Sequence, residues 1–108
     1  MSKVLVVAPD KAPEVVDLPD GLDPMQKLVG GWIENVTLEG DPDLGGIGLI
    51  CNEEGKLMGL PWNRFLPEIE DTICGTFFIS RFNEDGETVD LTVNDIMKYS
   101  LRFAVARP

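Results

Sequence analysis

The sequence predicts an α+β fold in which a mostly antiparallel sheet carries two short helices. Short β-branched and aromatic runs alternate with turns rich in glycine, proline, asparagine and aspartate. Only two stretches combine a helix-capping pattern with apolar residues at helical spacing. The chain has 108 residues, of which 44% are hydrophobic, and this is enough for one core. We therefore treat residues 1–108 as a single domain.

Two short strands open the chain. Residues 3–8 are a β-branched run that ends at a Pro-Asp turn, and residues 14–18 lie between two prolines. Together they predict a β-hairpin.

A first helix is predicted to follow, with Asp23 as its side-chain cap, Pro24 at its first position and Gln26 reaching back to the N–H of the cap. It ends at Gly30-Gly31, because glycine readily adopts the positive φ of a helix terminus. A helix of about two turns is marginal alone, so packing against the sheet must stabilise it.

The middle of the chain predicts a strand, a loop and a hairpin. Residues 32–39 alternate between apolar and polar side chains, and residues 40–46 are rich in glycine and aspartate. Residues 47–51 and 56–60 are expected to pair around the turn between them. Residues 60–67 are expected to be irregular or a single turn.

The most hydrophobic strand candidate is residues 71–81, which we expect at the centre of the sheet. Gly75 interrupts this run, and we expect another element to pack closely against its backbone. A turn at residues 83–86 and a short strand at residues 88–91 follow.

The second helix is predicted to open with a capping box formed by Thr92 and Asp95. Ile96, Tyr99 and Phe103 then share one face, which we expect to pack on the sheet.

Composition excludes several function classes. The chain has no histidine, so serine–histidine and cysteine–histidine catalysis and imidazole zinc sites are not available. Cys51 and Cys74 lie in apolar runs, which favours buried, unpaired thiols over a disulfide or a nucleophile. The acidic pairs fit no calcium-loop pattern. We expect no enzymatic activity, metal or cofactor.

Charge and hydropathy point to a protein that remains in the cytoplasm and does not bind nucleic acid directly. Nineteen acidic residues face nine basic ones, a formal net charge of −10, which repels phosphates. No run is long and apolar enough for a membrane helix, and the first ten residues lack the features of a secretory signal. The acidity either confers solubility or imitates the charge of DNA toward a partner that binds nucleic acid.

Four segments resemble the domain of unknown function 3846 (DUF3846) family: residues 26–34, 51–64, 73–77 and 91–96. Residues 51–64, with the sequence CNEEGKLMGLPWNR, are the most specific of them, and the resemblance extends over residues 3–100. The resemblance implies a setting in bacteria, phages and plasmids, and a binding or sequestering role rather than a defined reaction. For a phage-encoded chain, the location would be the cytoplasm of the host.

The strongest candidate site is Asn63-Arg64, because an amide beside a guanidinium on irregular backbone can recognise an anion or a nucleobase. Trp62 can stack on a planar ligand, and Gln26 can bring a second amide. The structural alternative is that Asn63 caps a turn, Arg64 pairs with an acid, Gln26 completes its capping box and Trp62 closes the edge of the core.

A second candidate is the polar turn that contains Asn52 and Lys56, for which ordinary turn chemistry is the alternative. Trp32 flanks a glycine-rich turn, and we expect it at the edge of the core.

Two functions follow as expectations. In the first, the protein counteracts a host defence system by sequestering a small anionic ligand, such as a signalling nucleotide, in a pocket around Arg64 that a homo-oligomer can complete. In the second, its acidic surface imitates DNA and inhibits a host nucleic-acid-binding protein.

Overall fold

The computed structural model describes residues 1–41 and 43–104. It confirms a single compact α+β domain with a mostly antiparallel sheet and two helices. In chain order the elements are β1 (Ser2–Val7), β2 (Glu14–Leu18), α1 (Leu22–Val29), β3 (Ile33–Asp41), β4 (Gly45–Asn52), β5 (Trp62–Leu66), the 3₁₀ turn η1 (Pro67–Ile69), β6 (Asp71–Cys74), β7 (Phe77–Phe82), β8 (Thr88–Val89) and α2 (Val93–Arg102).

The main sheet has the strand order β2-β1-β7-β4-β3, and β8 also pairs with β7. All of its pairings are antiparallel. The remaining strands, β5 and β6, form a separate antiparallel pair. The predicted hairpin of β1 and β2 is confirmed, and β7 is central as expected.

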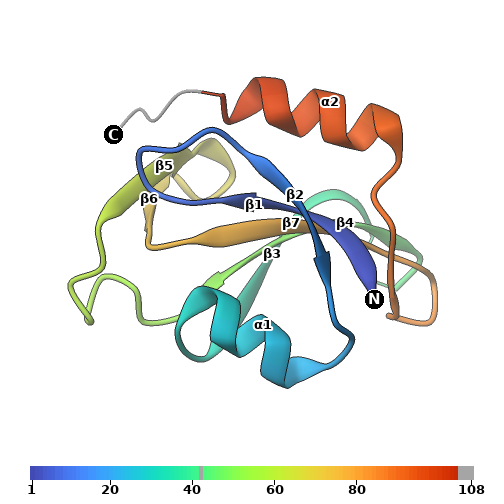
Figure 1. Cartoon of the computed structure of the whole chain (residues 1–108), viewed down its shortest axis with the longest axis horizontal. Coiled ribbons are helices and arrows are strands. Elements are labelled where there is room, and N and C mark those ends of the chain that lie inside the picture. Colours follow the sequence, from blue (N-terminus) through green and yellow to red (C-terminus); the bar gives the residue numbers. More distant parts are fainter. Residues whose placement is uncertain (42, 105–108) are drawn as a thin grey trace.

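The two helices cover opposite faces of the main sheet (Figure 1). On the α2 side, Tyr99 and Phe103 pack with buried residues of β1, β4 and β7 and with Leu66 and Ile73 of the small sheet. On the α1 side, Val29 packs with Phe78 and other residues of the sheet. Because strand side chains alternate between faces, one sheet supplies both cores.

The capping box of α2 is confirmed, but the predicted cap of α1 is wrong. Helix α1 begins at Leu22, and Gly21 occupies the N-cap position without a side-chain hydrogen bond. Asp23 and Pro24 lie in the first turn instead, where backbone N–H groups have no helical partner, so proline is tolerated there. The helix ends before Gly30, as predicted.

The expected hairpin of residues 47–51 with residues 56–60 is also wrong. Strand β4 is flanked by β3 and β7, so neither of its edges is free for a third strand. The chain after β4 folds into consecutive turns, in which Met58 N–H donates to the Glu54 carbonyl and Leu60 N–H to the Gly55 carbonyl. The expected loop at residues 40–46 is shorter, because β3 and β4 extend into it.

The prediction that residues 60–67 are irregular or a single turn is wrong, because they contain β5. Its partner β6 comes from the first part of the run 71–81, which was expected to be one strand. The run is instead divided at Gly75, between β6 and β7. The predicted close packing at this glycine is confirmed, although its place within a strand is not.

We expect Gly75→Val to lower the free energy of unfolding by about 2–3 kcal/mol. Gly75 has φ +87°, which disfavours a β-branched residue, and an added Cβ would lie 2.7 Å from Cδ1 of Leu60. Urea denaturation measures the change. Gly86→Val is the matched control, because Gly86 has φ +78° with no atom within 4 Å of its added Cβ. Equal losses in the two variants would show that the contact with Leu60 does not matter.

Candidate functional site

Asn63 is buried inside the protein, where its side chain is hydrogen-bonded within the fold. It is 2% exposed and lies in β5, at an irregularity in the pairing with β6. Its amide nitrogen donates to the carbonyls of Val7 at 2.8 Å and Gly75 at 2.9 Å, and its Oδ1 accepts from Arg64 Nη1 at 2.8 Å. The amide therefore joins β1, β5 and the turn between β6 and β7.

Arg64 is equally enclosed, at 3% exposure. Its Nε and Nη2 donate to the Phe103 carbonyl at 3.2 and 2.9 Å, and Nη2 also donates to the Lys11 carbonyl at 2.6 Å. No carboxylate of the described residues lies within ion-pair distance of Arg64. Burial lowers the pKa of this guanidinium, and the carboxylate of Asp10 opposes that shift.

This arrangement favours a structural role for the pair, although not the one considered from the sequence. The partners of Arg64 are carbonyl oxygens instead of an acid, and all three of its nitrogens already donate to the protein. We call Asn63, Arg64 and the carbonyls of Val7, Lys11, Gly75 and Phe103 the Arg64 network. As it stands, the network leaves no nitrogen of Arg64 for an anion.

The other predicted site residues do not join Arg64. Asn52 is buried, with its amide nitrogen 3.2 Å from the Val29 carbonyl and its Oδ1 accepting from Glu54 N–H at 2.8 Å, so it stabilises the turn after β4. Lys56 pairs with Asp71. Gln26 lies half-buried in α1. Trp62 is 67% exposed.

Asn52 and Lys56 do line one hollow, of about 140 Å³. Its charged lining is one cation, already paired, against four acidic residues: Glu34, Glu53, Glu54 and Asp71. Such a lining repels an anion. The predicted anion-binding site requires several cations that converge on one place. The described part of the chain contains no such set.

Trp32 does not close the edge of the core as predicted: it is 66% exposed, because the turn that it flanks faces solvent. Both cysteines are buried and free, as predicted. Burial and the nearby carboxylate of Glu34 raise the pKa of the Cys51 thiol to about 11, which disfavours a nucleophilic thiolate.

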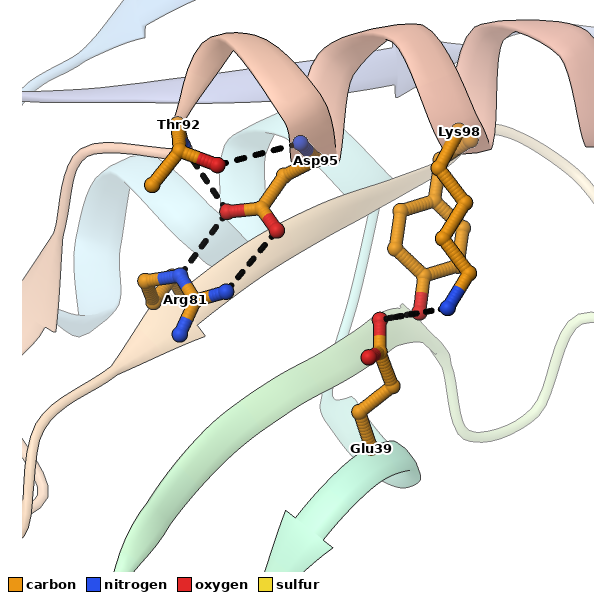
Figure 2. Close-up of polar contacts among 6 residues, drawn as sticks. Glu39, Arg81, Thr92, Asp95 and Lys98 are labelled. Carbon is orange, nitrogen blue, oxygen red and sulfur yellow. Dashed lines mark hydrogen bonds and ion pairs between the residues drawn. The ribbon is translucent and has the colours of Figure 1, made fainter.

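Sequence reasoning missed two polar contacts that attach α2 to the sheet (Figure 2). Arg81 of β7 donates to both carboxylate oxygens of Asp95, each at 2.8 Å. Glu39 of β3 accepts from the Tyr99 hydroxyl and pairs with Lys98 at 3.2 Å. The hydrogen bond from Tyr99 lowers the pKa of Glu39, while burial raises that of Tyr99. The capping pattern at Asp95 was visible in the sequence, but nothing there indicated its pairing with Arg81.

The surface charge is strongly one-sided. Six of the nineteen acidic residues form ion pairs, which leaves thirteen without one among the described residues. All thirteen are exposed: Asp10, Glu14, Asp23, Glu34, Asp41, Asp43, Glu53, Glu54, Glu70, Glu84, Asp85, Glu87 and Asp90. Five of the nine basic residues are paired and Arg64 is buried, so only Lys11 and Lys27 remain exposed and unpaired in the described chain.

Some of these acidic residues lie around a groove of about 200 Å³ on the α1 side of the sheet. We call it the β3–β4 groove, lined among others by Asn35, Thr37, Gly46, Gly48 and Phe82. Glu39 and Asp41 also line it, although the carboxylate of Glu39 binds Tyr99 and Lys98 of α2, and Gly86 brings the acidic turn between β7 and β8 to its rim. The arrangement can accept cationic groups and disfavours anions.

Comparison with known proteins gives a family and no function. No curated protein and no solved structure shows a significant match to the chain. Neither helix in the described part of the chain is long and apolar enough to span a membrane. The family model described as "Domain of unknown function (DUF3846)" matches residues 1–104, so the chain belongs to the DUF3846 family.

Proposed function

We propose that the protein is a non-catalytic binding protein whose acidic surface occupies a basic surface of a partner protein. The observation that carries this proposal is the imbalance of unpaired surface charge, thirteen carboxylates against two lysines among the described residues. Charge of one sign attracts a complementary surface and speeds association with it.

A protein that binds nucleic acid is the partner that best fits this charge. Its basic surface has evolved to accept closely spaced phosphates, and exposed carboxylates offer the same sign of charge. The turn between β7 and β8 carries Glu84, Asp85 and Glu87, and none of them has an ion-pair partner in the described chain. The family resemblance implies a phage or plasmid setting. In that setting the partner is a protein of the host, and the host's defence proteins are among the candidates.

The test is affinity capture from a host lysate, with duplex DNA and salt as competitors. We expect captured partners to be released by DNA and by rising ionic strength, because both weaken contacts between charged surfaces. A variant with Glu84→Gln, Asp85→Asn and Glu87→Gln should capture several-fold less. Its matched control, Glu14→Gln, Asp23→Asn and Glu70→Gln, carries the same net charge and should still bind.

Equilibrium dialysis against ATP and a cyclic dinucleotide tests the competing function. Tight binding of either nucleotide, without any partner that DNA displaces, would overturn the proposal in favour of sequestration of an anionic ligand. Capture that is insensitive to both DNA and salt would also contradict it.

A further inference from the structure

The outer edge of β3 is an open site for strand addition. Strand β3 pairs with β4 alone and stands at the end of the main sheet, so in the described chain its other edge has no partner strand. An unpaired edge presents a row of backbone N–H and C=O groups that can pair with an extended chain. The geometry points to this edge as the docking site for an extended, basic segment of a partner protein.

The opposite end of the sheet is better protected. Strand β2 has five residues, and Pro13 and Pro19 bracket it. Proline lacks the N–H that a strand needs, so the two prolines limit any pairing there. Strand β3 has nine residues with neither proline nor lysine, two of the devices that protect an edge, and its irregularity interrupts only the part beyond Thr37. An irregularity between Thr37 and Glu39 leaves Ile33–Thr37 as its regular part.

The acidic residues of β3 favour a basic segment as the added strand. Its charged residues are Glu34, Glu39 and Asp41, all acidic; Glu39 pairs with Lys98, whereas Glu34 and Asp41 have no ion-pair partner among the described residues. Glu53 follows β4 at the Ile33 end of the pair, and its N–H donates to the Trp32 carbonyl at 2.8 Å. A strand added at this edge would place its side chains beside carboxylates at both ends, so cationic side chains would be favoured across the junction.

The β3–β4 groove adds a reason to expect long cationic side chains. Strand addition gains specificity when alternate side chains of the added strand enter pockets. The groove lies beside β3 on the α1 side, where Phe82 lines it and Gly86 brings the acidic turn between β7 and β8 to its rim. An arginine or lysine whose side chain crosses β3 would rest its aliphatic part on Phe82 while its charge faces the acidic turn that carries Glu84, Asp85 and Glu87.

A second copy of this chain is a poor occupant. Antiparallel pairing of two β3 strands would bring together two chains with a net charge of −10 each, with the acidic residues of both strands at the junction. Like charges across a strand pair are destabilising. The inference rests on the proposed basic partner, but it concerns backbone pairing, which charge alone does not supply.

The experiment measures the affinity of a short synthetic peptide of alternating arginine and threonine for the full-length protein. Its control has the same sequence and charge with consecutive central peptide nitrogens methylated, which removes the N–H groups needed for strand pairing. We expect the unmodified peptide to bind at least about tenfold more tightly. It should also slow hydrogen exchange of backbone amides in Ile33–Thr37.

Charge reversal on the protein locates the site. Glu34→Lys should weaken binding of the unmodified peptide several-fold, whereas Glu14→Lys on β2 makes the same change on the other end strand and should have a much smaller effect. Equal affinity for the two peptides would overturn strand addition while leaving the proposed acidic surface standing. Three further results would each overturn the inference: absence of binding, protection of β2 instead of β3, and self-association of the protein through β3. The capture experiment decides the proposed function separately.

Discussion

Arg64→Ala should lower the free energy of unfolding by about 3 kcal/mol or more, one of the largest effects of any single substitution in this protein. The change removes the hydrogen bonds to the carbonyls of Phe103 and Lys11 and leaves Oδ1 of Asn63 without its donor. Hydrogen bonds from charged groups contribute about 1.5–3 kcal/mol each. Removing a buried charge relieves its desolvation and offsets part of this loss.

Urea denaturation of Arg64→Ala, Arg64→Lys and Arg102→Ala measures this effect. Lysine should restore only part of the stability, because a single ammonium cannot reach the separate carbonyls that the guanidinium fork contacts. Arg102 forms an ion pair with Glu68 at the surface, so its loss should change stability by about 1 kcal/mol or less. A stable Arg64→Ala protein that has lost partner binding would instead restore Arg64 as a functional contact.

Asp95→Asn should destabilise the protein by about 2 kcal/mol at neutral pH, and this difference should shrink as the pH falls. The hydrogen bonds from Arg81 lower the pKa of Asp95 from 3.8 to about 2, against the opposing effect of burial. A carboxyl whose pKa is depressed by folding stabilises the fold above its unfolded pKa. That contribution is lost as the pH falls from about 4 toward about 2.

Denaturation curves of the wild type and Asp95→Asn between about pH 5 and pH 2 test this expectation. The same comparison in an Arg81→Ala background is the control, because the shift should be much smaller once the main hydrogen-bond donor is absent. A difference between wild type and Asp95→Asn that stays constant over this pH range would contradict the assignment.

The sequence predicted strands and helices well where local pattern decides. The run before Pro9 and the capping box at Thr92 are local signals, and both led to correct elements. The errors in the predicted elements arose where several segments could pair with the same strand. Residues 56–60 have a strand-like composition, but both edges of β4 are occupied, so they fold into turns.

The candidate site could be predicted only in part, for a similar reason. The sequence marked Asn63-Arg64 as unusual, and the structure shows an unusual feature there, a buried guanidinium that binds carbonyl groups. Its partners are 39 and 53 residues away along the chain. Every residue carries a carbonyl, so no side-chain pattern indicates which ones Arg64 will contact.

The Arg64 network also bears on the order of events during folding. Its hydrogen bonds join β5 to residues near both ends of the described chain, with sequence separations of 39 to 56 residues. Closing such long loops is entropically unfavourable until other contacts already hold the chain together. We therefore expect the network to form late in folding, so that Arg64→Ala mainly speeds unfolding, and to hold the C-terminal end of α2 in place once folding is complete.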